Sequence, residues 1–263
     1  MLVAVCAGAS LARAQGAGAH TPEVVPPYDS FTVQSSALRE LRRINIHAPK
    51  GASSALPVLV MPDGGIDEDF PHVARAVDSL VATGRIRPVL LVGIPNTERR
   101  RDLTGPTRIK IDSAIAPHVG GSAAFRAFIR DELIPEITRR YRVTTERSII
   151  GESLAGLFIV ETFLREPALF THYVALDPSV WWNGGALVDE APTLLRAHDS
   201  RERSLFFAST NEKLISVGSA KLDTVLRAAQ VRGLRFMYEP HEELTHATIF
   251  RALELKALEH ALR

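Results

Sequence analysis

The sequence predicts an α/β protein in which helices flank a doubly wound, mostly parallel sheet of eight strands. Short apolar runs, such as residues 57–61 (PVLVM) and 89–94 (VLLVGI), have the composition of strands that are buried on both faces. They alternate with segments whose apolar residues recur every three to four positions, which is the spacing of an amphipathic helix. This alternation is typical of βαβ units, and a sheet of this kind fits in one domain of about 250 residues.

The elements can be assigned in order along the chain. Residues 31–34 and 38–47 alternate apolar and polar side chains, which predicts two opening antiparallel strands. The further predicted strands are 57–61, 89–94, 148–150, 173–176, 204–208 and 235–238. The predicted helices are 70–83, 123–141, 154–164, 187–197, 217–232 and 248–262. Residues 96–121 are polar and basic without clear periodicity, so no regular element is predicted there.

The composition excludes several classes of protein. The chain has 263 residues, a formal net charge of +1 and one cysteine. A balanced charge provides no net basic field for nucleic acid, and a single cysteine forms neither an internal disulfide nor a cysteine-based zinc site. No apolar run is long enough for a membrane-spanning helix. We therefore expect a globular protein whose partner is a small molecule, and the sequence leaves its oligomeric state open.

The N-terminus has the features of an export signal. Residues 1–14 (MLVAVCAGASLARA) lack acidic side chains, begin apolar and end in an A-x-A pattern that a signal peptidase accepts, although no basic residue follows Met1. We expect a signal peptide over 1–14, a flexible N-terminus over 15–28 and a catalytic domain over 29–263. Cys6 lies inside the leader, so the processed chain would be free of cysteine. This suits a periplasmic or secreted protein.

Residues 151–156 (GESLAG) indicate a nucleophile elbow. They lie where the predicted strand 148–150 ends and the helix 154–164 begins, which is the context that this motif requires. A sharp strand-to-helix turn leaves room only for small side chains two positions before and after Ser153, and Gly151 and Ala155 meet that condition. The turn would expose the Ser153 hydroxyl and direct the Leu154 N–H toward a developing oxyanion.

A serine nucleophile needs a histidine base and a carboxylate, which follow the serine in the order acid, then histidine, in this architecture. His246 lies between the last strand and the last helix and is the preferred base, with His241 as its competitor. Glu212 follows the strand 204–208 and is the preferred acid. Asp177 ends the preceding strand and is the alternative acid, because it too could reach the imidazole.

The loop after strand 57–61 is the expected source of the second oxyanion donor. Gly64 and Gly65 would let a backbone N–H approach a substrate closely. No cofactor is required for this chemistry. His241 and His246 are five positions apart rather than the four of a zinc-binding H-E-x-x-H helix, so no metal site is expected.

Five segments resemble a known family. They are residues 59–64 (LVMPDG), 92–96 (VGIPN) with 101–104 (RDLT), 151–156 (GESLAG), 177–183 (DPSVWWN) and 245–247 (THA). Together they are similar to the α/β-hydrolase family that includes esterase D and the enterochelin-esterase-like siderophore hydrolases, over about residues 29–262. Two departures stand out. Ala155 replaces a common glycine, and Asp177 stands where serine is common, which puts the identity of the acid in doubt.

The resemblance implies a serine esterase with Ser153 as nucleophile, His246 as base, an acid near Glu212 and an oxyanion hole at Leu154 and the Gly64–Gly65 loop. We expect an exported enzyme that hydrolyses carboxylic esters, including bulky, siderophore-type esters. There are three alternatives: acyl transfer to an alcohol at the same site, a non-catalytic binding protein on the same scaffold, and a cytosolic thioester hydrolase.

Two further side chains are candidates for substrate binding. Trp182 could form a wall of a substrate pocket. Arg101 could bind an anionic substrate.

Overall fold

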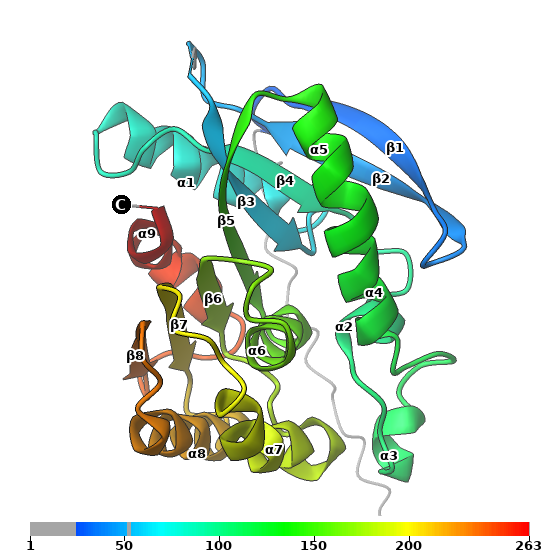
Figure 1. The fold of residues 1–263 in the computed structure, drawn as a ribbon, viewed down its shortest axis with the longest axis vertical. Helices are drawn as coiled ribbons and strands as arrows, with labels where there is room; N and C mark the ends of the chain where they lie inside the picture. The colour runs from blue at the N-terminus through cyan, green and yellow to red at the C-terminus, as the bar shows by residue number, and fades with distance from the viewer. Residues whose placement is uncertain (1–24, 52–53, 263) are drawn as a thin grey trace, which may run out of the picture.

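The computed structural model describes residues 25–51 and 54–262, so the predicted leader and residues 15–24 lie outside the described part. One eight-stranded sheet runs through the molecule in the order β1-β2-β4-β3-β5-β6-β7-β8 (Figure 1). Its strands are β1 (Asp29–Ser35), β2 (Glu40–His47), β3 (Leu56–Pro62), β4 (Leu90–Ile94), β5 (Val143–Glu152), β6 (His172–Leu176), β7 (Arg203–Ser209) and β8 (Leu234–Pro240). The predicted fold class is confirmed.

The strand directions also match the prediction. β1 pairs antiparallel with β2, and β2 pairs antiparallel with β4, while every later pairing in the sheet is parallel. The predicted strand 148–150 is only the buried end of β5, which starts at Val143. The first half of β5 is partly exposed, so it lacks the continuous apolar run that identified its second half.

The helices fill the connections between the strands. They are α1 (Phe70–Ala82), α2 (Arg99–Leu103), α3 (Lys110–Ser113), α4 (Ser122–Phe128), α5 (Ile134–Arg140), α6 (Leu154–Arg165), α7 (Ala186–Leu195), α8 (Lys213–Ala229) and α9 (Ile249–Leu262). A π-helical turn (Ile129–Leu133) separates α4 from α5 within the single helix predicted at 123–141. Pro135 lacks the N–H that would bond back to residue 131, so the break lies at the expected place. The basic region 96–121 contains the short α2 and α3.

Two apolar clusters cover the two faces of the sheet. Alternate residues of a strand point to opposite faces, and in β3 Leu59 joins one cluster while Val60 joins the other. α1 and α9 pack on the first face, whereas α4, α5, α6 and α7 pack on the second. Figure 1 shows α1 and α9 together on one side of the strands and α4 and α5 on the other. This layering buries the central strands β3 and β4 along their whole length.

The parallel part of the sheet determines where a site can form. β3, β5, β6 and β7 are neighbours and run in the same direction, so their carboxyl ends lie along one edge. In open sheets of this kind, ligands bind beyond those ends. The residues that follow the four strands therefore come together. No helix within residues 25–51 and 54–262 is long and apolar enough to cross a membrane.

Candidate active site

Ser153 lies at a strained turn between β5 and α6. Its φ of 61° and ψ of −118° place a non-glycine residue outside the usual regions. The turn has space only for small side chains at Gly151 and Ala155. A Cβ at Gly151 would lie 2.6 Å from the Cβ of Ala155, which is closer than two carbon atoms can approach. A Cβ at Gly156 would lie 3.0 Å from the Leu176 carbonyl oxygen. The tight packing of this turn therefore explains why glycine stands at 151 and 156.

His246 bridges Ser153 and Asp177. Its Nε2 lies 3.1 Å from the Ser153 Oγ, and its Nδ1 lies 2.5 Å from Asp177 Oδ2. In the tautomer that fits both contacts, Nδ1–H donates to the carboxylate and Nε2 accepts the serine hydroxyl proton. The three side chains come from the carboxyl ends of β5 and β6 and from the segment between β8 and α9. Their order along the chain is serine, acid, histidine.

Asp177 is held in place from several directions. Its side chain is 0% exposed, and its Oδ1 accepts a hydrogen bond of 2.7 Å from the Thr210 N–H. The Thr210 hydroxyl donates to Oδ2 at 3.1 Å, and the Asp177 N–H donates to the Ala208 carbonyl at 2.8 Å. A buried carboxylate with this many donors is fixed in orientation, so it can fix the imidazole in turn.

The pKa of His246 is raised above its ordinary value. The hydrogen bond that His246 donates to Asp177 is the largest contribution, and it outweighs the opposing effect of partial burial. The negative charges of Glu152, Asp177 and Glu212 raise it further. An imidazolium is therefore stabilised at this position, which is what a base that takes a proton from serine requires.

Glu212, the preferred acid from the sequence, does not contact the imidazole. It is exposed, precedes the first residue of α8, and affects His246 only as a more distant charge. Asp177, the alternative, makes the contact. The sequence pattern could not separate the two, because both residues follow parallel strands next to the site. The structure places Asp177 against the imidazole because β6 is the direct neighbour of β5, whereas β7, which leads to Glu212, is one strand further away.

Glu152, which precedes Ser153, is a second carboxyl group whose charge acts on the imidazole. Burial raises its pKa to about 7, and the charges of Asp69 and Asp177 act in the same direction, while His246 and Arg99 oppose them. Its Oε1 is buried without a hydrogen-bond partner. The sequence prediction treated this position only as the variable residue of the motif, although a carboxyl group directly before the candidate nucleophile was a usable signal.

The loop after β3 holds the two glycines predicted to donate to an oxyanion. The Gly64 N–H already donates to the Ile94 carbonyl at 3.1 Å, so it is part of the link to β4. The Gly65 N–H donates to Glu68 Oε2 at 2.7 Å, an acceptor that belongs to a side chain. Leu154 is the first residue of α6, so its N–H has no acceptor within the helix. The geometry thus favours Leu154 and Gly65 over Gly64.

Asp63 adopts a left-handed conformation, with φ of 56°, immediately before those glycines. The Arg99 guanidinium donates to both oxygens of the Asp63 carboxylate, from Nε to Oδ1 at 2.7 Å and from Nη2 to Oδ2 at 2.8 Å. The Asn96 side-chain amide donates to Oδ1 at 2.5 Å. These contacts stabilise the left-handed conformation of Asp63 and so the start of the Gly64–Gly65 loop, which follows the carboxyl end of β3, the strand next to β5. The sequence analysis did not identify Arg99 in this role.

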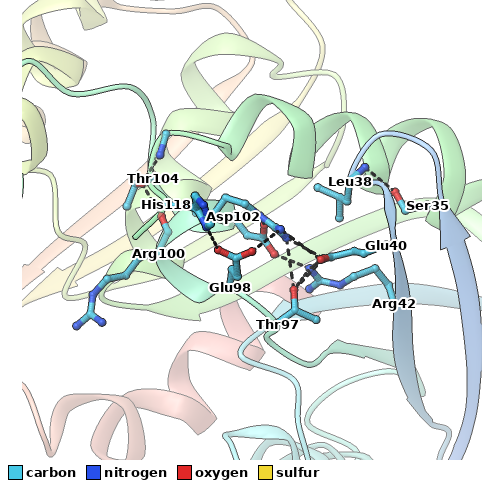
Figure 2. Close-up of polar contacts among 12 residues, drawn as sticks. Ser35, Leu38, Glu40, Arg42, Thr97, Glu98, Arg100, Asp102, Thr104 and His118 are labelled. Atoms are coloured by element: carbon cyan, nitrogen blue, oxygen red, sulfur yellow. Dashed lines mark hydrogen bonds and ion pairs between the residues drawn. The ribbon is translucent and has the colours of Figure 1, made fainter. Parts of the chain in front are cut away.

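Arg101, the predicted anion-binding residue, is surrounded by carboxylates. It donates to Glu40 at 2.7 Å, Glu98 at 3.1 Å and Asp102 at 2.7 Å. Partial burial lowers the pKa of Arg101, but the hydrogen bonds that it donates to Glu40 and Asp102 outweigh that effect and raise the pKa. Figure 2 shows the surrounding cluster, in which Glu40, Arg42 and Asp102 converge. The structure does not bring Arg101 together with Ser153 or His246 in any hydrogen bond, and these carboxylates offset the charge that would attract an anionic substrate.

Trp182 is anchored and lines a cavity at the same time. Its indole N–H donates to the Gly105 carbonyl at 2.8 Å, and only 4% of the residue is exposed. One face borders a cavity of about 580 Å³ that is also lined by Leu157 and Leu187. Leu157 is one helical turn beyond Ser153, but Ser153 does not line the cavity. Trp182 thus lines a cavity, as predicted, and its contact with a substrate stays a prediction.

His241, the competing base, makes different contacts. Its Nδ1 lies 2.7 Å from Glu243 Oε1, and its Nε2 lies 3.3 Å from Glu239 Oε2. Within the described ranges, no group of three or more His, Cys, Asp or Glu side chains is arranged to hold a metal ion.

Comparison with known proteins agrees with this architecture. Over 109 residues, 36% of this chain, the sequence is 38% identical to the ferri-bacillibactin esterase of Bacillus subtilis strain 168. Over 149 residues, 52% of this chain, it is 32% identical to the siderophore triacetylfusarinine C esterase of Aspergillus fumigatus. The matched segments span only 38% and 48% of those two proteins' own lengths.

A solved structure and a family model extend the match over most of the chain. The structure of an IroE-like serine hydrolase from Shewanella oneidensis superposes with a TM-score of 0.78 at 26% identity, covering 89% of this chain and 79% of that one. The model of the family described as "Putative esterase" matches residues 35–250. The chain therefore belongs to this esterase family of α/β-hydrolase fold.

Proposed function

We propose that the protein is a serine esterase that cleaves carboxylic esters with Ser153, His246 and Asp177. One observation carries the proposal: the unbroken hydrogen-bond chain from the Ser153 hydroxyl through His246 to the buried Asp177 carboxylate. Membership in an esterase family supports it independently.

The chemistry follows from the geometry. His246 Nε2 takes the proton from the Ser153 hydroxyl as Oγ attacks the ester carbonyl carbon. The Leu154 and Gly65 N–H groups stabilise the negative oxygen of the tetrahedral intermediate. His246 then gives the proton to the departing alkoxide, and an acyl-enzyme remains on Ser153. Water, deprotonated by His246, attacks the acyl group and releases the acid.

The substrate class that we propose is a siderophore-type ester. The curated relatives named above are a ferri-bacillibactin esterase and a siderophore triacetylfusarinine C esterase. Because those matches cover less than half of each relative, the proposal needs a direct test with both kinds of substrate.

The test begins with a fluorophosphonate probe, which phosphonylates an activated serine. We expect the wild-type protein to be labelled and Ser153→Ala to remain unlabelled. Absence of Ser153-dependent labelling would refute the esterase proposal in favour of a non-catalytic binding protein. Hydrolysis of a tri-catecholate lactone and of a hydroxamate siderophore ester, each compared with a simple nitrophenyl ester, then tests the substrate class. Product analysis with added alcohols distinguishes hydrolysis from acyl transfer.

Export also remains a proposal, supported by the sequence of residues 1–14. N-terminal sequencing of the protein recovered from expressing cells tests it. A mature start at Gln15 is expected, and retention of Met1 in all fractions would argue against processing.

A further inference from the structure

The turn after β3 contains a reciprocal contact between Gly65 and Glu68. The Glu68 backbone N–H donates to the Gly65 carbonyl at 3.1 Å, and the Gly65 N–H donates to Glu68 Oε2 at 2.7 Å. The side-chain bond has the spacing of one half of a capping box, in which a glutamate reaches back to the N–H three residues before it, but here it closes the turn that precedes α1. A carboxylate oxygen thus lies where the Gly65 N–H points.

The same N–H is the one that the proposed mechanism assigns to the oxyanion. The other glycine of the loop cannot substitute, because the Gly64 N–H bonds to the Ile94 backbone and helps to join β3 to β4. The Gly65 N–H differs in that its acceptor is a side chain, which can rotate away without disturbing the sheet. One N–H cannot serve both a carboxylate and an oxyanion at full strength.

The surroundings of Glu68 offer its carboxylate a second position. Asn96 donates from its side chain to Glu68 Oε1 at 2.6 Å, and this bond does not involve Gly65. The charge of Glu68 also contributes to raising the pKa of Arg99, so that guanidinium is within electrostatic reach. Glu68 is only half-buried, and water can solvate the released oxygen. The carboxylate can therefore leave Gly65 while it retains Asn96 and approaches Arg99.

We propose that Glu68 blocks the second oxyanion donor. Its carboxylate accepts the hydrogen bond of the Gly65 N–H, and it has to move away before that N–H can bind the negative oxygen of the tetrahedral intermediate. The proposal rests on the esterase function proposed above. Glu68 orders the loop through its contacts with Gly65 and Asn96, and it competes with the transition state for the N–H. Its negative charge also opposes the charge that develops on the substrate oxygen.

An aryl trifluoromethyl ketone tests the proposal, because Ser153 adds to its carbonyl and forms a stable hemiketal whose oxyanion needs the same N–H. In Glu68→Ala we expect roughly tenfold tighter inhibition and a similar rise in kcat/KM on a neutral nitrophenyl ester, on the scale of one charged hydrogen bond. Glu68→Gln retains an acceptor oxygen without the charge, so its gain should be smaller. Asp67→Ala, an exposed neighbour, should match the wild type.

Each outcome decides a different question. Unchanged or weaker inhibition in Glu68→Ala, with an active wild type, would overturn the proposal and leave Glu68 a purely structural residue. If Glu68→Ala melts below the assay temperature, Glu68→Gln decides, and the absence of any gain there overturns the proposal equally. A wild-type protein without Ser153-dependent activity would instead refute the esterase function itself.

Discussion

Asp177 Oδ2 lies 2.5 Å from His246 Nδ1, at the completely buried end of the Ser153–His246 hydrogen-bond chain. The Thr210 N–H and hydroxyl complete the coordination of this carboxylate. Glu212 lies on the same edge of the sheet but is exposed and acts on the imidazole only through its charge. The two carboxylates thus have separable roles.

Exchanging each carboxylate for its amide separates those roles. Asp177→Asn retains the shape but removes the acceptor charge that fixes the tautomer, and we expect kcat/KM to fall by about 10³- to 10⁴-fold. Glu212→Gln should stay within about threefold of the wild type, since it removes only a screened, exposed charge. Steady-state kinetics on a nitrophenyl ester measure both. The reverse ranking would return the acid role to Glu212.

The pH dependence of kcat/KM should report the influence of Glu152 on His246. The ionised Glu152 carboxylate raises the pKa of His246, and the base must be neutral to act. Glu152→Gln removes that charge, lowers the pKa of His246 and should move the acid limb of the pH profile to lower pH. Glu212→Gln should shift the limb in the same direction but less. An unmoved limb, or one at higher pH, in Glu152→Gln would contradict this coupling.

The sequence predicted the fold and the strained turn at Ser153 because both depend on local patterns. Buried strands appear as apolar runs, and the Ser153 turn demands small residues at Gly151 and Ala155, as the close Cβ contact shows. The acid was harder to predict, because its choice depends on which loop directs a carboxylate at the imidazole. Both Asp177 and Glu212 follow suitable strands, and only the three-dimensional arrangement distinguishes them.

The arginine-rich segment shows a second limit of the sequence. Arg99, Arg100 and Arg101 look equivalent in a polar region without periodicity. In the fold, Arg99 holds Asp63 and Arg101 joins the Glu40 cluster, whereas Arg100 is exposed. Their partners lie on elements distant in sequence, so spacing along the chain carries no information about them.

The ion pair between Arg42 and Asp102 should be essential for stability. Both side chains are almost completely buried, and Arg42 Nη1 lies 2.5 Å from Asp102 Oδ2 (Figure 2). Arg42→Met removes one of the two guanidinium groups that bind the buried Asp102 carboxylate, the other being that of Arg101, and it also removes the Arg42 bond to Glu40. We expect a loss of about 2–3 kcal/mol in the free energy of unfolding. Arg100→Met, in the exposed neighbour, should change stability by less than about 0.5 kcal/mol. Denaturant titration measures both, and equal effects would contradict the assignment.

Arg101 should contribute to the fold rather than to substrate binding. Its guanidinium is already bonded to Glu40, Glu98 and Asp102. We therefore expect Arg101→Met to lower the melting temperature while the KM ratio between an anionic and a neutral nitrophenyl ester stays within about twofold of the wild type. A selective rise in KM for the anionic ester would restore the substrate-binding role.

The contact between Gly151 and Ala155 allows a double-mutant test of the nucleophile turn. In Gly151→Ala the new Cβ would lie 2.6 Å from the Ala155 Cβ, so the turn has to shift and displace the Ser153 hydroxyl from His246. Overpacking of this kind costs about 1–3 kcal/mol, and we expect kcat/KM to fall roughly tenfold or more.

Ala155→Gly removes the opposing methyl group and should restore most of that loss in the double variant. On its own, Ala155→Gly should cost only about 1 kcal/mol of stability, because glycine is the poorer helix former. Kinetics of the four proteins, with thermal melts to confirm folding, complete the cycle. Additive effects would mean that the Gly151–Ala155 contact does not limit the turn. Recovery of activity in the double variant would show that the loss in Gly151→Ala comes from the clash between the Cβ atoms at 151 and 155, because Ala155→Gly adds no group to the site.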